Sequence, residues 1–381
     1  MTFDLKSLVR PNILSLEPYR CARDDYSEGI LLDANENAYG SVLSTEDDFH
    51  RYPDPLHNEV KEKWIKYRNL DSVKQAFFGV GSDEVIDLTI RIFCTPGKDK
   101  ILINTPTYGM YSVCAKVNDV EVIKVGLTPG IGDIASRFQL RLDQIEQQLI
   151  AEKGLIKVIF ICSPGNPTGT SLNFESIKDT LNLGLKYGSI VVVDEAYVDF
   201  ADQSACSLIK EYPNLIVMQT LSKSFGLAGI RLGAAFGNSE LIHIFNCTKA
   251  PYNICSLTAG VANEALSDAG IEKMESTVSK LNSQREILIQ KLKQFELVGE
   301  HLGNLDANFV LAPILDPVTK EPNSELAKKV YLQLADDHQV VVRYRANEDG
   351  CKGCLRITIG TPEEIDTFLN RLQAILDKLA K

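Results

Sequence analysis

Short runs of apolar residues alternate with amphipathic helical patterns through the first two thirds of the chain. The runs lie at 76–80, 100–103, 120–125, 158–162, 190–193, 215–218 and 233–236. Runs of Val and Ile that are apolar at every position predict strands buried on both faces, as in a parallel sheet covered by helices. The pattern therefore predicts an α/β fold with a mostly parallel sheet.

The pattern changes after about residue 250. A long charged helical pattern covers 256–296, and a helix is expected near 324–336, between strand-like segments at 308–311, 339–343 and 355–359. Thr361, Pro362 and Glu364 form a capping-box start for a final helix. We predict a larger domain over 41–250, a smaller α+β domain over 251–381, and an N-terminal arm over 1–40 that packs on the small domain.

A lysine follows the apolar run at 215–218. Lys223 lies among small and hydroxyl residues such as Ser222, and Arg231 comes eight positions later. Ligands of open α/β sheets bind beyond the carboxyl ends of the strands. A lysine there can form a Schiff base with a carbonyl compound, and the hydroxyls and the arginine can hold a phosphate. Taken alone, the segment is equally consistent with a solvated lysine in a Gly-rich loop.

Asp194 ends the most hydrophobic run of the chain, three residues before Tyr197. A carboxylate buried there needs a cationic or hydrogen-bonding partner, and either a protonated pyridine nitrogen or a metal ion would serve. The five histidines are dispersed without paired ligand spacing, so we predict no metal site. Tyr197 could equally be a core residue.

Two further segments could bind anions. Residues 79–84 begin like a dinucleotide-binding fingerprint, but the third glycine is missing, which leaves a helix N-terminus at Ser82 and Asp83 that can bind an anion or simply be capped. Arg343 and Arg356 could converge on one anion if their strands pair, or they could be surface arginines. Cys351 and Cys354 are interpreted as a surface loop with free thiols, not as a zinc site.

The bulk composition narrows the partners and the compartment. A net charge of −11 argues against nucleic acid or an anionic membrane as a partner. Nine scattered cysteines, no signal sequence and no apolar run of membrane-span length predict a cytoplasmic protein.

Pyridoxal 5'-phosphate requires the combination of groups described above: a lysine, a buried carboxylate, a phosphate-binding cradle and arginines. The chain also resembles the fold-type I pyridoxal-phosphate aminotransferases, and within them the histidinol-phosphate aminotransferase family, in its fungal form. Ala38 departs from this family, which usually has proline there. The motifs that carry the resemblance are 16–23, 32–37, 51–54, 81–84, 163–169, 194–197, 222–233, 250–253 and 350–360.

The resemblance implies roles for individual residues. Lys223 would be the Schiff-base lysine, Asp194 would pair with the pyridine nitrogen, Tyr197 and Asn166 would bond the ring oxygen, and Tyr108 would stack on the ring. Tyr52 would reach the cofactor phosphate from a partner subunit, which implies a homodimer with shared active sites. The arm would pack on that partner as well as on the small domain. The phosphate would be held by Ser82, Asp83, Ser222 and Arg231, and the substrates by Tyr19, Tyr252, Arg343 and Arg356, with Asn35 and Asn37 nearby.

The implied reaction transfers an amino group from L-histidinol phosphate to 2-oxoglutarate, giving imidazole acetol phosphate and glutamate in histidine biosynthesis. One alternative is an aromatic or broad-specificity amino-acid aminotransferase of the same fold. A non-catalytic regulator and a nicotinamide dehydrogenase are weaker alternatives.

Overall fold

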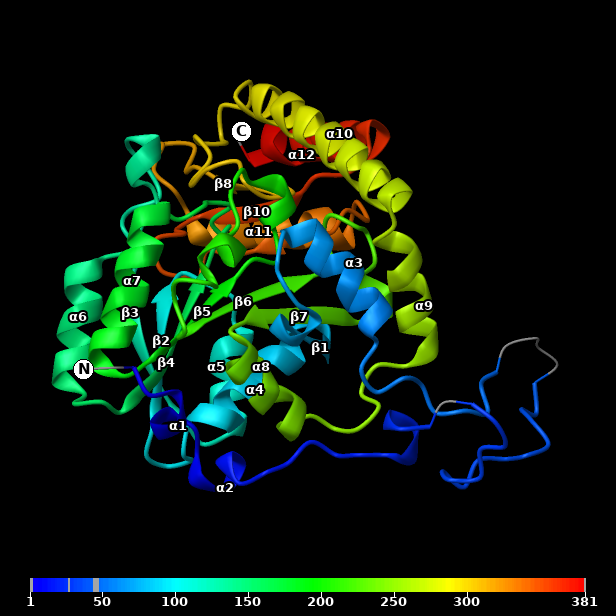
Figure 1. Ribbon diagram of the computed structural model, residues 1–381. Helices are drawn as coiled ribbons and strands as arrows, with labels where there is room; N and C mark the ends of the chain where they lie inside the picture. The colour runs from blue at the N-terminus through cyan, green and yellow to red at the C-terminus, as the bar shows by residue number, and fades with distance from the viewer. Residues whose placement is uncertain (1–2, 27, 44–47, 380–381) are drawn as a thin grey trace.

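The computed structural model describes residues 3–26, 28–43 and 48–379, and its centre is a seven-stranded sheet (Figure 1). Six strands are parallel, and β7 alone runs antiparallel to its two neighbours, β1 and β6. This confirms the predicted α/β fold with a mostly parallel sheet. In spatial order the strands are β1 (Ala76–Val80), β7 (Leu232–Gly237), β6 (Leu215–Thr220), β5 (Ile190–Asp194), β4 (Ile156–Cys162), β2 (Lys100–Thr105) and β3 (Glu121–Gly126).

Helices bury both faces of this sheet at its centre, which explains why β5 and β6 are buried at every position and lack polar alternation. Along β5, Val191 and Val193 pack with α3, α6 and α7, whereas Ile190 and Val192 pack with α4, α5 and α8. The helices are α3 (Asn58–Arg68), α4 (Gly81–Phe93), α5 (Met110–Val117), α6 (Leu142–Ala151), α7 (Phe174–Tyr187) and α8 (Ser239–Thr248).

A three-stranded antiparallel sheet lies in the C-terminal part, in the order β8 (Phe309–Pro313), β10 (Cys354–Thr358) and β9 (Arg343–Tyr344). One face of it packs on α11 (Ser324–Asp336), α12 (Pro362–Leu379) and the end of α10 (Asp268–Leu292). The predicted capping box at the start of α12 is confirmed. The Thr361 N–H donates to Glu364 at 2.7 Å, and the Glu364 N–H donates to the Thr361 hydroxyl at 3.3 Å.

Three local predictions were wrong. The helical pattern 256–296 forms two helices, α9 (Ser256–Ala265) and α10, because Ser267 caps a new start. The strand expected at 339–343 is reduced to β9, since the chain is still turning out of α11 at Gln339, whose φ is 54°. Cys351 and Cys354 are buried against Phe138, so they do not form a surface loop.

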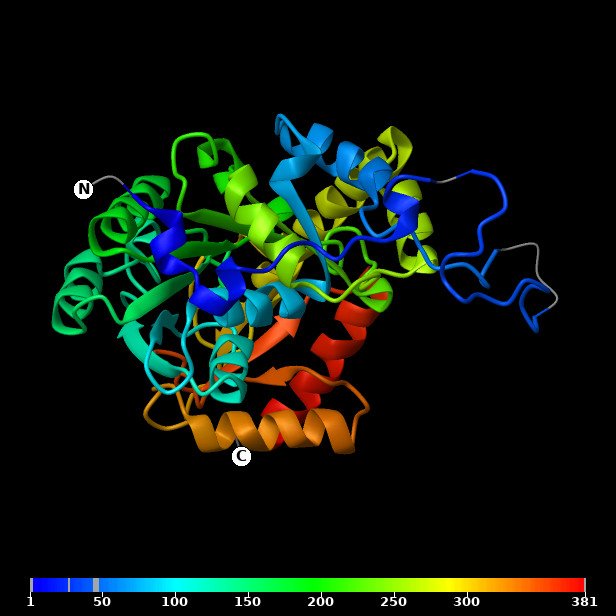
Figure 2. The same cartoon turned by 60° about the horizontal axis from the view of Figure 1, so that its bottom comes forward.

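The first part of the predicted arm packs on the large sheet's helices, not on the small domain. Leu5 and Leu8 of α1 (Leu5–Leu8) join the core beneath α4 and α8, and the Arg10 N–H donates to the Ile92 carbonyl at 3.0 Å. Figure 2 shows α1 and α2 (Pro11–Leu14), in dark blue, away from the orange and red C-terminal helices.

Candidate active site

Lys223 lies in the turn that follows β6, at the carboxyl edge of the large sheet. The turn is closed by the Leu227 N–H, which donates to the Leu221 carbonyl at 3.1 Å. The Lys223 Nζ lies 5.7 Å from the centroid of the Tyr197 ring. Burial and the nearby Arg356 lower the pKa of Lys223, while the Asp194 carboxylate acts in the opposite direction. The surroundings therefore favour a neutral, nucleophilic amine at a lower pH than usual.

Asp194 ends β5 and is only 2% exposed. Its carboxylate accepts hydrogen bonds from the Ala196 N–H at 3.1 Å and from the Tyr111 hydroxyl at 2.5 Å. Burial raises the pKa of Asp194 to about 6, and both hydrogen bonds oppose that rise. A buried carboxylate with so few donors suits a cationic partner such as a protonated pyridine nitrogen.

Tyr111 is a site residue that the sequence did not reveal. It lies on α5, its ring stacks on Phe160 at 4.9 Å, and Tyr108 meets it edge-on at 5.8 Å. It is fully buried, so its hydroxyl is fixed against Asp194. The only sequence signal was its position three residues after Tyr108.

An anion cradle forms where α4 begins. The Gly81 N–H donates to the Arg231 carbonyl at 2.8 Å, and the Arg231 guanidinium lies 3.3 Å from the Asp83 carboxylate. Gly81 and Gly233 allow this approach: a Cβ at Gly81 would lie 2.5 Å from Arg231 Nη2, and one at Gly233 would lie 2.4 Å from the Ser82 nitrogen. The helix N-terminus beside a guanidinium fits a phosphate group.

Two more predicted residues border this cradle. The Ser222 hydroxyl lies 2.9 Å from the Thr220 hydroxyl, which also bonds the Leu232 carbonyl. The Tyr108 hydroxyl donates to Asp83 at 3.1 Å. Hydroxyl groups that can donate to a phosphate, and an aromatic ring, therefore lie at the same edge of the sheet as Lys223.

Arg356 reaches the site from the small sheet. Its guanidinium donates to the Asn166 side chain and lies 5.1 Å from the centroid of the Phe309 ring. Phe309 in turn meets Tyr197 edge-on at 5.3 Å. Burial lowers the pKa of Arg356, and its Nε has no hydrogen-bond partner within the described residues. A buried donor without a partner is suited to an anionic ligand.

The remaining predicted residues lie elsewhere. Tyr52 stacks on Tyr252 at 4.8 Å, and Tyr19 meets Tyr252 edge-on at 6.3 Å. Asn37 accepts a local bond from the Tyr39 N–H. Among the described residues no ring contact or hydrogen bond joins these four to Lys223 or Asp194. Arg343 is exposed on β9.

A buried carboxylate holds this outlying segment together. Glu36 accepts hydrogen bonds from Arg23 and Arg51 and, at 2.7 Å, from the Tyr52 N–H. The two guanidiniums hold the pKa of Glu36 well below its usual range. Tyr52 is therefore fixed to the segment that carries Asn37. Figure 1 shows this blue segment extending away from the main body.

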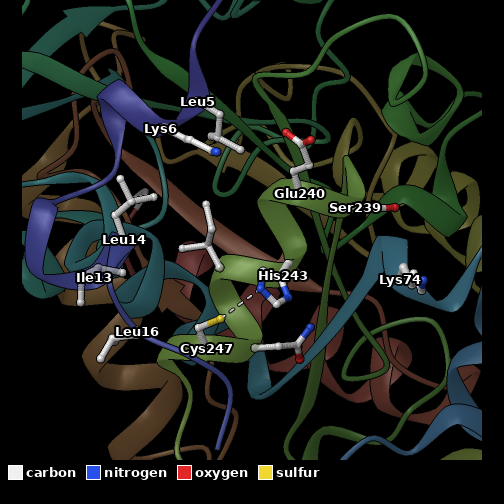
Figure 3. A pocket seen from close by; sticks show the side chains of 12 residues that line it. Leu5, Lys6, Ile13, Leu14, Leu16, Lys74, Ser239, Glu240, His243 and Cys247 are labelled. Atoms are coloured by element: carbon white, nitrogen blue, oxygen red, sulfur yellow. Dashed lines mark hydrogen bonds between the residues drawn. The ribbon is translucent and has the colours of Figure 1, made fainter.

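A cavity of about 600 Å³ lies apart from this site, between α1, α2 and α8. Figure 3 shows His243 and Cys247 of α8 facing each other on one wall, 3.5 Å apart, with Leu14 opposite. None of the residues lining it was predicted for the site.

No helix in the described part of the chain is long and apolar enough to cross a membrane. The described side chains include no group of three or more His, Cys, Asp or Glu placed to hold a metal ion.

Comparison with known proteins shows the family of this chain. The model of the family "Aminotransferase class I and II" matches residues 25–372. The chain is 49% identical to histidinol-phosphate aminotransferase of Schizosaccharomyces pombe over 99% of this chain and 98% of that one, and 47% identical to that of Saccharomyces cerevisiae over the full length of both. The chain therefore belongs to the class I and II aminotransferases.

Within this class the relatives with high identity share one name. Histidinol-phosphate aminotransferase of Candida maltosa is 47% identical over 99% of both chains. The solved structure of the Clostridium acetobutylicum enzyme of that name has a TM-score of 0.74 at 24% identity, covering 87% of this chain and 92% of that one. The chain is a member of the histidinol-phosphate aminotransferase family.

Proposed function

We propose that this protein transfers the amino group of L-histidinol phosphate to 2-oxoglutarate, with pyridoxal 5'-phosphate as cofactor. The products are imidazole acetol phosphate and glutamate, and the reaction serves histidine biosynthesis. The donor carbon is oxidised to a ketone, and the acceptor is reduced to an amine. The observation that carries the proposal is the grouping of Lys223, Asp194 and Arg356 in one site of a chain 47–49% identical to histidinol-phosphate aminotransferases.

The cofactor's residues are those at the carboxyl edge of the large sheet. When bound, pyridoxal 5'-phosphate supplies an electron sink for charge that develops at the substrate carbon. Asp194 would hold a proton on the pyridine nitrogen, because its buried carboxylate is stabilised by a cation. Tyr108 would cover the ring, and Tyr197 and Asn166 would bond the ring oxygen. The phosphate would lie at the α4 N-terminus, held by Ser82, Asp83, Ser222 and Arg231.

Lys223 carries the proton chemistry. Its amine would hold the cofactor in the resting enzyme. During the reaction the same amine would take the proton from the substrate carbon as a general base and then give it up as a general acid. Burial and Arg356 both lower the pKa of Lys223, which increases the fraction that can act as a base near neutral pH. Arg356 would bind the phosphate of the amino donor and a carboxylate of the second substrate in turn, together with Arg343.

We also propose a homodimer whose active sites are shared. Tyr19 and Tyr52 are 64% and 53% exposed although they form one aromatic cluster with Tyr252. Large exposed aromatic groups of this kind favour a protein partner. Tyr52 would reach the partner's cofactor phosphate, and Tyr19, Tyr252 and Asn37 would approach its substrate.

We also propose domain boundaries at 40 and 250 and a cytoplasmic location. The two sheets have separate apolar clusters, which supports a division into two domains, although Ile254, Ala262 and Leu266 beyond residue 250 pack with the large sheet. All nine cysteines lie in the described part of the chain and no disulfide joins any two of them, as expected in a reducing compartment.

The substrate assignment is tested by comparing two amino donors. The purified holoenzyme is expected to show a kcat/KM for L-histidinol phosphate far above that for phenylalanine, because a phosphate dianion uses more of the arginine site than a carboxylate does. Equal or reversed values would favour an aromatic aminotransferase instead.

A further inference from the structure

A third arginine accompanies Arg343 and Arg356 on the small sheet. Arg343 pairs with Arg356 across β9 and β10, and the ladder continues one step as the Arg345 N–H donates to the Cys354 carbonyl at 3.0 Å. Because alternate residues of a strand point to the same face, Arg343, Arg345, Arg356 and Cys354 share one face of the sheet.

This shared face turns toward the large sheet. Arg356 donates to Asn166 beyond β4, and Cys354 packs against Phe138. The intervening residues Leu355 and Ile357 point the other way, into the core beneath α11 and α12. Arg345 therefore belongs to the wall that carries Arg356.

Arg345 is more enclosed than Arg343. Its side chain is 20% exposed, whereas Arg343 lies exposed at the sheet edge. The Glu348 carboxylate accepts from Arg345 Nη1 at 2.5 Å and fixes the guanidinium. In the described structure the buried Nε of Arg345, like that of Arg356, has no hydrogen-bond partner. Two guanidiniums of this wall thus keep a shielded donor that no protein group uses.

The charge of Arg345 also reaches the active site. Burial raises the pKa of Tyr197, and the positive charges of Arg356 and Arg345 both act against that rise. Burial is the main cause that lowers the pKa of Arg356, and the positive charge of Arg345 lowers it further. The positive charges of two neighbouring guanidiniums repel each other, and an anion placed between them relieves this repulsion.

We infer that Arg345, held by Glu348, is a specificity-determining residue that binds the phosphate end of the amino donor. The inference rests on the proposed function and adds a residue to its substrate site. Among the described residues Glu348 is the one carboxylate that forms an ion pair with any of these three arginines, so the arginines outnumber their ion-pair partners by two. A phosphate monoester carries about −1.5 to −2 near neutral pH, whereas one carboxylate carries a single negative charge. The third arginine therefore favours the phosphate substrate over the dicarboxylate substrate.

The test compares L-histidinol phosphate with L-histidinol, which differs only by the phosphate. In the holoenzyme, Arg345→Gln is expected to lower kcat/KM for L-histidinol phosphate roughly tenfold or more, since a charge-assisted hydrogen bond is lost. The values for L-histidinol and for glutamate should change no more than about twofold. Lys352→Gln, on an exposed position of the same loop, is the matched control and should leave all three unchanged.

A second variant keeps the test decisive if Arg345→Gln does not fold. Arg345→Lys retains the charge but not the planar fork, so it should show a smaller loss confined to L-histidinol phosphate. Inorganic phosphate should also inhibit Arg345→Gln more weakly than wild type in competition with glutamate. Equal losses for L-histidinol and its phosphate in these variants would overturn the inference. A wild-type enzyme that prefers L-histidinol would instead overturn the proposed function, so the two failures are distinguishable.

Discussion

Removing the Tyr111 hydroxyl isolates one interaction beneath the proposed cofactor site. Tyr111→Phe keeps the ring that stacks on Phe160 and deletes only the donor to Asp194. Asp194 then retains the Ala196 N–H as its remaining hydrogen-bond donor in the described structure. The variant therefore changes the electrostatics of a buried carboxylate without opening a large cavity.

The expected magnitude follows from the burial of that carboxylate. Burial raises the pKa of Asp194 from its ordinary 3.8 to about 6, and Tyr111 opposes this rise. A hydrogen bond to a charged group contributes about 1.5–3 kcal/mol, and about 1.4 kcal/mol corresponds to one pH unit. Tyr111→Phe should thus raise the pKa of Asp194 by roughly one to two pH units.

The sign of the pH dependence follows from which form of Asp194 each state prefers. The Asp194 carboxyl group holds its proton more tightly in the folded apoenzyme than in the unfolded chain. Protonation of Asp194 therefore stabilises the folded state fully below pH 3.8, and this stabilisation is lost as the pH rises to about 6. A protonated pyridine nitrogen requires the ionised carboxylate. Cofactor affinity should therefore fall as the pH drops through about 6 in the wild type, and at a higher pH in Tyr111→Phe.

The assay is titration of apoenzyme with pyridoxal 5'-phosphate, followed by absorbance, between about pH 5 and 9. Tyr187→Phe is the matched control, because it removes a tyrosine hydroxyl from the surface carboxylate of Glu146 at 2.8 Å. The control should keep the wild-type midpoint. The reasoning is refuted if Tyr111→Phe also keeps that midpoint.

Two other substitutions test the cradle and the anion site. Gly233→Ala would place a Cβ 2.4 Å from backbone atoms of Gly81 and Ser82, so it should lower the free energy of unfolding by about 1–3 kcal/mol and weaken cofactor binding. Thermal melts should show no such loss for Gly260→Ala, whose Cβ meets nothing within 4 Å; a similar melting temperature for both variants would be inconsistent with the crowding. Arg356→Ala should raise KM for both L-histidinol phosphate and 2-oxoglutarate in steady-state kinetics. A change in only one KM would mean that the two substrates do not share the anion site.

The sequence predicted those parts of the molecule that depend on local pattern. Uninterrupted Val and Ile runs such as 190–193 gave the strands of the large sheet, because burial on both faces removes polar alternation. Asp194 ends such a run and Lys223 lies in the turn beyond another, so both could be predicted to lie at the carboxyl edge of the sheet. The start of α12 was predictable because its capping box spans only four residues, from Thr361 to Glu364.

The parts that were missed depend on long-range packing. Tyr111 meets Asp194 across 83 positions of sequence, and Arg345 shares a face of the small sheet with Arg356 only through its register with Cys354. Leu5 and Leu8 could not be assigned to either domain from their own pattern, which is satisfied by any apolar surface. Cys351 and Cys354 were placed at the surface because a short polar loop surrounds them, whereas tertiary contacts bury both.

The proposed chemistry is tested most directly by a half-reaction that involves Lys223. Purified holoenzyme is mixed with L-histidinol phosphate in the absence of an acceptor, and the cofactor's visible absorbance is followed together with the ketone product. The wild type should lose the absorbance of the aldehyde form, release about one product per site, and recover the absorbance when 2-oxoglutarate is added. Lys223→Ala, with its cofactor still bound, should form no product. Product formation by Lys223→Ala at a rate near that of the wild type would contradict the assignment of Lys223 as the proton-transferring residue.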